Sequence, residues 1–252
     1  MALAFLNDPD RDGIYRLVTW KECANRTTYD MPNSFDFTVL TPELVKADVE
    51  RGRPYSFSLG GGIHKWRWTR PSISCEAWSD NAVESLLGLA DSFGVTGIDI
   101  QQESWKDKWS WVDCMAQMVR KMKERRPELV ISIGPFGDTL RQYERLFKAV
   151  GKQIDYVLYQ PYACSRCTGT VGKVFHDVTR ASKKLGCPMS KILFGFEPTR
   201  GGDAIRVPGV FDTAKELRKL GVAGTFTWTV EKVMDDDYYV PRHLTMAMTD
   251  KS

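Results

Sequence analysis

Residues 95–103 read V-T-G-I-D-I-Q-Q-E, and this stretch decides the fold. Val95, Ile98 and Ile100 are β-branched, and Gly94 stands just before them. A short run of β-branched residues after a glycine is typical of a buried strand. We therefore expect a strand here, enclosed by other elements of the chain.

Three polar side chains alternate along the same stretch. Asp99, Gln101 and Glu103 are two residues apart, so all three project to one side of the sheet. Burying two carboxyl groups and an amide costs free energy unless they pair or take part in chemistry. One interpretation is a hydrogen-bonded structural pair of acids. The other is a functional site, since buried acids with perturbed pKa values gather at such sites.

The composition is that of an ordinary globular domain. The chain has 252 residues, of which 42% are hydrophobic and 27% charged, so we expect one domain over residues 1–252. The formal charge of +3 is too small to indicate nucleic acid or membrane surfaces as partners, and no apolar run is long enough to span a membrane. We expect a monomer.

The opening sequence M-A-L-A-F-L-N-D-P has no charged segment followed by a long apolar run, so we predict no signal peptide. The compartment stays open: the cytoplasm if the sequence is taken as written, or a secreted or vacuolar location if the N-terminus is truncated. The glycosylation sequon at Asn25 matters only in the second case.

Short apolar stretches alternate with amphipathic ones along the whole chain. Seven of them are predicted strands: residues 2–6, 55–59, 95–103, 129–133, 156–160, 192–196 and 224–228. The predicted helices between and after them cover residues 41–50, 79–93, 105–126, 139–150, 171–185, 212–220 and the tail from 241. This alternation predicts a parallel sheet covered by helices, that is, an α/β barrel of the TIM type. A closed (β/α)8 barrel needs eight strands, so we expect the first strand to be missing before Met1.

Some local signals fix individual elements. Thr41 followed by Pro42 predicts a helix start, and Ser79 is the predicted cap of the next helix. Residues 15–20 suggest a hairpin excursion. In the long predicted helix at 105–126, apolar side chains recur at helical spacing, at residues 109, 112, 115 or 116, and 119. We expect Trp105, Trp109 and Trp111 to serve in helix packing and loop cover.

The ends of the predicted strands carry acids, aromatic rings, an amide and a glycine turn. They lie at residues 7–8, 58–62, 99–103, 134–136, 159–162, 196–197 and 228–231. In a barrel, these carboxyl ends are where functional groups gather. The composition suits a sugar-binding cleft, with Trp228 as its floor and Glu103 at its centre.

Four motifs at these ends resemble glycoside hydrolase family 18, the chitinases and their non-catalytic relatives. S-L-G-G at 58–61 resembles the family's S-x-G-G, and T-G-I-D-I-Q-Q-E at 96–103 resembles its D-G-x-D-x-D-x-E. Y-Q-P-Y at 159–162 resembles the Gln/Tyr pair of the sixth strand, and G-T-F-T-W at 224–228 resembles the eighth strand with its Trp. The resemblance covers nearly the whole chain. The polar excursion after the first strand resembles the narbonin and bulb-chitinase branch.

The resemblance implies catalytic roles for the central strand. Glu103 would protonate the glycosidic oxygen, and the substrate's own N-acetyl oxygen would attack the anomeric carbon. The family's middle Asp, which orients the acetamido group and offsets the positive charge of the intermediate, is here Gln101. Asp99 matches the supporting acid, and Thr96 stands where the leading Asp is expected. Losing an electrostatic group of this kind costs about 10²–10³ in rate.

The resemblance also implies sugar contacts outside the central strand. The candidates are Ser58, Gly60, Tyr159, Gln160, Tyr162 and Trp228. Four of these candidates have a plainer alternative. Trp228 suits a core position, Gln160 and Tyr162 suit ordinary hydrogen bonding at a strand end, and Gly60 suits the turn that leaves the strand.

The six cysteines do not settle the redox compartment. Cys164 and Cys167 form a C-x-x-C motif, but together with His176 and Cys187 they fit no standard zinc spacing. We expect a local disulfide or free buried thiols there, no metal site and no cofactor.

The sequence therefore predicts a chitinase-like protein that binds chitin or N-acetylglucosamine oligosaccharides, with weak or lost hydrolysis because the middle acid is Gln101. One alternative is an active glycoside hydrolase that uses Glu103 as its general acid. A second is a seed-storage-like or interaction protein that binds no glycan.

Overall fold

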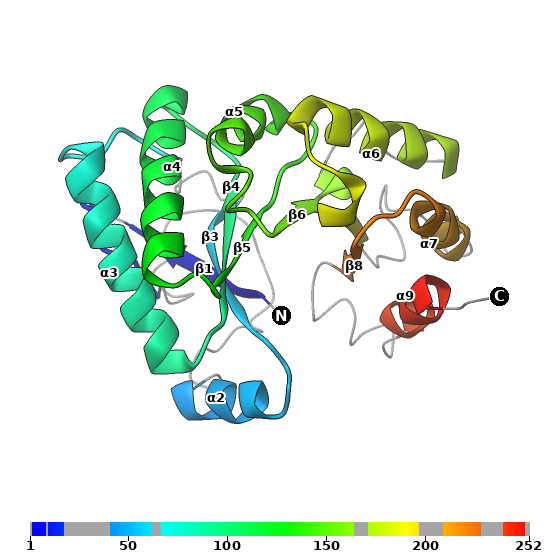
Figure 1. The fold of residues 1–252 in the computed structure, drawn as a ribbon, viewed down its shortest axis with the longest axis horizontal. Helices are drawn as coiled ribbons and strands as arrows, with labels where there is room; N and C mark the ends of the chain where they lie inside the picture. The colour runs from blue at the N-terminus through cyan, green and yellow to red at the C-terminus, as the bar shows by residue number, and fades with distance from the viewer. Residues whose placement is uncertain are drawn as a thin grey trace, which may run out of the picture. The chain divides into compact units, whose positions relative to one another are not determined.

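The computed structural model describes residues 2–8, 10–17, 41–61, 67–163, 171–196, 209–227 and 239–249. They belong to two compact units, residues 1–132 and residues 133–252, and Figure 1 labels most of their helices and strands. We call them the first and the second unit. A single domain over 1–252 stays a prediction. Among the described residues, every helix is too short or too polar to cross a bilayer.

The first unit holds the strands β1 (Ala2–Asn7), β2 (Arg16–Leu17), β3 (Ser56–Gly61) and β4 (Gly97–Gln102), and β5 (Val130–Ile133) begins in it. Their order in the sheet is β2-β1-β3-β4-β5. The pairs β1–β3 and β3–β4 are parallel, whereas β2 runs antiparallel to β1. The short β2 lies in the stretch predicted to form a hairpin.

Three helices complete the first unit: α2 (Pro42–Glu50), α3 (Cys75–Phe93) and α4 (Lys108–Arg125). Thr41 caps α2 as predicted, with its hydroxyl accepting from the amide of Leu44. The predicted cap of α3 is wrong. Ser74 accepts from the amide of Ala77, and Ser79 lies buried inside the helix. The sequence-based prediction left out the first helical turn, because Ser74 and Ser79 are both favourable N-cap residues and only one of them can begin the helix.

The helices α3 and α4 lie side by side (Figure 1), and a disulfide joins Cys75 to Cys114. The buried stripe of α4 includes the predicted positions Met115, Ala116 and Val119, but not the whole predicted set. Trp109 and Val112 lie outside it, and the fully buried large side chains are Trp111, Met115, Met118, Val119 and Met122. Both stripes satisfy the helical period, so tertiary packing decides which face is buried.

The second unit holds β6 (Tyr156–Tyr159), β7 (Ile192–Phe196) and β8 (Gly224–Thr227), which pair in parallel in that order. Its helices are α5 (Leu140–Val150), α6 (Val171–Leu185), α7 (Gly209–Lys219) and α9 (Tyr239–Thr249), with short 3₁₀ turns at Pro161–Ala163 and Met189–Lys191. All seven strands predicted from the sequence are therefore present in the described ranges, each followed by a helix.

Candidate active site

The register of two parallel strands builds the centre of the site. Ser58 of β3 stands opposite Asp99 of β4, and Gly60 stands opposite Gln101. The Ser58 hydroxyl lies 2.9 Å from Asp99 Oδ2 and 3.2 Å from Gln101 Oε1. One side chain can reach both residues only if they share a face of the sheet. The prediction that Asp99 and Gln101 project to the same side is confirmed.

Asp99 is held by two hydroxyl groups from its neighbouring strands. Ser58 donates to one carboxyl oxygen, and Ser132 of β5 donates to the other at 2.7 Å. The side chain is buried, with the residue only 3% exposed. Burial raises the pKa of Asp99 above its ordinary value, although both serine hydroxyls act to lower it. Ser132 was not among the predicted site residues, but the alternation of I-S-I at 131–133 could have placed it on this face.

Ser58 has a single hydroxyl proton for two acceptors. Ser58 Oγ can donate it to Asp99 Oδ2 or to Gln101 Oε1, and Gln101 is a neutral amide where a second carboxylate would add charge. Gln101 therefore joins the buried network without adding a negative charge to it.

Glu103 lies one residue beyond the end of β4, in a different environment. It is partly exposed, and within the described part of the chain no hydrogen bond or ion pair reaches its carboxyl group. Burial alone raises the pKa of Glu103 to about 7. A carboxylic acid with that pKa is substantially protonated at neutral pH, so it can donate a proton to a bound molecule.

Gly60 and Gly61 end β3 with φ angles of +96° and +97°. A Cβ atom on Gly60 would lie 3.0 Å from Gln102 Oε1 and 3.1 Å from the backbone oxygen of Gln101. Both the φ angle and the space therefore require glycine at position 60. The neighbouring strand accounts for this requirement, which favours the plainer interpretation of Gly60 as part of the strand end.

Thr96 occupies the position of the leading acid. Its hydroxyl donates to the backbone oxygen of Tyr55 at 3.3 Å, and the residue is exposed at the start of β4.

Asp8, at the end of β1, accepts from the indole N–H of Trp78 at 2.7 Å and from the amide of Gly13 at 3.0 Å. Burial raises the pKa of Asp8, and these donors act to lower it.

In the second unit, Tyr159 and Gln160 have separate surroundings. Tyr159 is fully buried, and its hydroxyl donates to Asp177 of α6, which also binds Arg180 at 2.6 Å. The side chain thus faces a helix. This contact gives Tyr159 a structural role, and its predicted contact with sugar finds no support in its surroundings.

Gln160 and Tyr162 form a pair. The amide of Gln160 donates to the backbone oxygen of Gly134 at 2.9 Å, and its oxygen accepts from the Tyr162 hydroxyl at 3.1 Å. The ring of Tyr162 packs edge-on against Phe226, with centroids 6.3 Å apart. A Cβ atom on Gly195 would collide with both rings. The pair therefore presents an amide and a phenol held by fixed contacts.

Several predicted residues lie outside the described ranges: Trp228, Gly62, Glu197, Cys164, Cys167 and Asn25. Cys187, where the sequence analysis expects a disulfide or a free buried thiol, is a buried free thiol, and burial raises its pKa to about 11. Among the described residues, no three histidine, cysteine or acidic side chains come together in a way that could hold a metal ion. The disulfide between Cys75 and Cys114 was not predicted, and no sequence spacing signals it.

No family model matches the chain. A curated relative, Chitinase 1 of Tulipa saxatilis subsp. bakeri, is 32% identical over 206 residues, which are 78% of this chain and 64% of that protein. The chain thus spans slightly less than two thirds of the length of this relative.

Two solved structures have the same fold. The catalytic domain of a family GH18 chitinase from the fern Peteris ryukyuensis matches with a TM-score of 0.81 and 23% identity, over 99% of this chain and 89% of that one. A family 18 chitinase from Crocus vernus matches with a TM-score of 0.78 and 21% identity, over 99% and 89%. The predicted fold class, a partial (β/α)8 barrel of the TIM type, is confirmed.

Proposed function

Since the chain is a chitinase-like protein of glycoside hydrolase family 18, we propose that it binds N-acetylglucosamine-containing glycans and hydrolyses them weakly or not at all. The tulip relative is named a chitinase, which supports chitin oligosaccharides as the ligand class. The observation that carries the proposal is the neutral Gln101 in the hydrogen-bonded network of Asp99.

The chemistry explains why one missing charge matters. When the substrate's acetamido oxygen attacks the anomeric carbon, a positively charged oxazolinium ion forms beside the strand that carries Asp99 and Gln101. A unit negative charge about 4 Å from that ion would stabilise it by about 4 kcal/mol at an effective dielectric constant of 20. Gln101 supplies an amide dipole in place of that charge. We therefore expect a hydrolysis rate about 10²–10³ lower than with an aspartate.

Binding does not depend on the missing charge. The amide of Gln101 can exchange hydrogen bonds with an acetamido group, because it offers both a donor and an acceptor. The serine hydroxyls satisfy Asp99 without any ligand, so the network keeps its shape when the site is empty. A site with fixed polar groups loses little conformational entropy when a sugar enters.

A second candidate is a working hydrolase, and the environment of Glu103 favours it. A pKa of about 7 provides a proton donor in the neutral range, as the first step of hydrolysis requires. In this candidate Asp99 alone would stabilise the positive charge. Burial raises the pKa of Asp99, which disfavours its charged form and argues against this candidate.

Two measurements on the same protein separate the candidates. Calorimetric titration with chitin hexasaccharide measures binding, and chromatography of the same mixture measures products. The variants are Glu103→Gln and the control Glu124→Gln, which replaces an exposed glutamate on α4. Binding with no or very slow release of products supports the proposal. Rapid turnover that only Glu103→Gln abolishes supports the hydrolase. If neither binding nor products appear, the protein has a storage or interaction role instead.

A further inference from the structure

The first turn of α4 carries an exposed tryptophan. Trp109 is 64% exposed, whereas Trp111 is fully buried and packs edge-on against Trp105 with ring centroids 5.2 Å apart. The expectation of helix packing is therefore wrong for Trp109. Single exposed apolar residues are common on protein surfaces, so exposure alone indicates nothing. Two further observations bear on the role of Trp109: its backbone is rigidly held, and it lies at the Glu103 end of the first unit.

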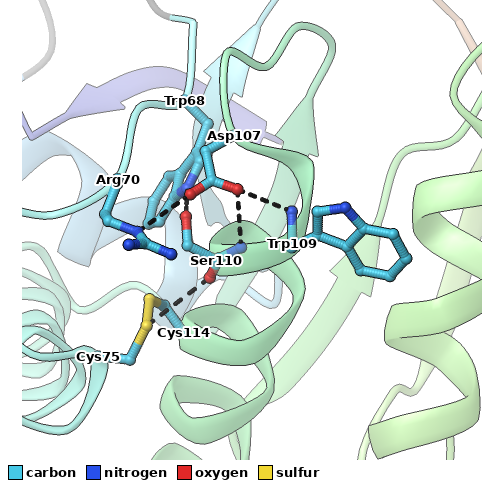
Figure 2. Close-up of polar contacts among 7 residues, drawn as sticks. All are labelled: Trp68, Arg70, Cys75, Asp107, Trp109, Ser110 and Cys114. Carbon is cyan, nitrogen blue, oxygen red and sulfur yellow. Dashed lines mark hydrogen bonds and ion pairs between the residues drawn. A yellow bond between two sulfur atoms is a disulfide. The ribbon is translucent and has the colours of Figure 1, made fainter.

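The backbone beneath Trp109 is fixed by a helix cap (Figure 2). Asp107 Oδ1 accepts from the amides of Trp109 and Ser110 at 3.1 and 3.2 Å, and Asp107 Oδ2 binds Arg70 Nε at 3.2 Å. The Ser110 hydroxyl accepts from the indole N–H of Trp68 at 3.0 Å. One helical turn further, the disulfide ties α4 to α3. The contacts with Arg70, with Trp68 and with α3 therefore fix the position of this helical turn.

The ring projects away from these contacts. Figure 2 shows the indole of Trp109 pointing away from Asp107, Ser110 and Trp68, which hold the turn. A large flat ring on a rigid base offers contact area at a low cost in conformational entropy. The ring face suits the apolar C–H face of a pyranose.

The chain places Trp109 at the same end of the first unit as Glu103. Glu103 follows β4, and Trp109 stands six residues later in the first turn of the next helix. Between them, the backbone amide of Trp68 donates to the oxygen of Ser104 at 3.0 Å, and the amide of Lys106 donates to the oxygen of Trp68 at 2.7 Å. These bonds fix the connection, so the two positions keep a constant relation.

The surroundings of Trp109 offer hydrogen-bond donors. Arg70, Lys106 and Lys108 are exposed on the segments that adjoin it. Guanidinium and ammonium groups donate to hydroxyl and carbonyl oxygens, which N-acetylglucosamine carries in abundance. An aromatic face with donors beside it suits a neutral, oxygen-rich sugar chain.

We propose that Trp109, mounted on the Asp107 cap beside Arg70, is an accessory platform on which a chain of N-acetylglucosamine units stacks beyond the Glu103 strand end. The inference rests on the proposed function and extends it to long chains. We expect a long oligosaccharide or solid chitin to contact the platform, and a disaccharide at the strand end not to. The platform therefore confers a preference for polymer.

The test compares Trp109→Ala and Trp109→Phe with the control Met246→Ala, which removes a side chain of equal exposure (63%) from α9 of the second unit. The probes are chitin disaccharide, chitin hexasaccharide and insoluble chitin. We expect Trp109→Ala to weaken binding of hexasaccharide and solid chitin about 3- to 10-fold, the range of one aromatic contact. Disaccharide binding should not change, Trp109→Phe should recover most of the loss, and Met246→Ala should match wild type.

The outcomes separate this inference from the proposed function. If wild type binds chitin and Trp109→Ala binds every probe equally well, the platform is refuted and the proposed function stands. If wild type binds no probe, both fail together. Sedimentation of wild type and Trp109→Ala completes the test, because a wild-type dimer that the substitution dissociates would make Trp109 a protein contact and overturn the inference. Thermal unfolding shows that each variant is folded.

Discussion

Replacing Glu103 by Gln should stabilise the protein, and the gain should depend on pH. Burial raises the pKa of Glu103 from 4.5 to about 7, so the folded protein resists ionising this group. Each pKa unit is worth 1.36 kcal/mol, which gives a destabilisation of at most about 3 kcal/mol for the ionised form. Water reaches the partly exposed side chain and screens part of this cost. Glutamine has nearly the same shape and carries no charge at any pH.

The sign follows from proton binding. Between pH 4.5 and pH 7 the folded state holds the Glu103 proton more tightly than the unfolded state, so the stability of wild type falls as the pH rises. Below pH 4.5 Glu103 is neutral in both states, and wild type and Glu103→Gln should have equal stability. Above pH 7 the full difference is present. Glu103→Gln should therefore exceed wild type by up to about 3 kcal/mol at pH 8.

Urea unfolding at constant ionic strength from pH 4 to pH 8 measures this difference. Glu124→Gln serves as the control, because Glu124 is exposed on α4 and loses little hydration on folding. Its difference from wild type should stay constant over the pH range. A constant difference for Glu103→Gln as well would refute the reasoning, since the carboxyl group would then be as well hydrated as one on the surface.

Three further substitutions test the scaffold around the site. Replacing Cys75 and Cys114 together by Ser should lower the free energy of unfolding by about 4 kcal/mol, the chain-entropy value for a loop of 39 residues, as urea unfolding without reductant would show. Gly60→Ala should cost more stability than Gly52→Ala, because both have positive φ angles but only Gly60 is crowded by a neighbouring strand; equal losses would contradict this. Ser132→Ala should cost about 1–3 kcal/mol at pH 7, since a buried carboxyl group loses a donor, and an unchanged urea midpoint would show that water replaces the hydroxyl.

The central strand could be predicted from the sequence because its signal is local. The two-residue alternation in 95–103 places Asp99 and Gln101 on one face without knowledge of any partner. The helix start at Thr41 is local in the same sense, since cap and first turn are adjacent in the chain. Seven strands and their helices follow from such signals, and with them the barrel class.

The features that could not be predicted from the sequence depend on packing between distant segments of the chain. Cys75 and Cys114 come from two helices, and only the packing of those helices brings them together. The stripe of α4 could begin at residue 109 or residue 111, and tertiary packing buries the second. The pKa of Glu103 is likewise set by burial, which depends on the segments packed around it.

The rate at which Gln101→Asp releases products from chitin hexasaccharide, relative to wild type, tests the central claim most directly. The substitution restores a carboxyl group where the positive charge develops. We expect little or no product from wild type and a rate about 10²–10³ higher from Gln101→Asp, with the gain abolished by adding Glu103→Gln. Wild-type hydrolysis that Gln101→Asp leaves unchanged would contradict the account, because the missing charge would then not limit the reaction.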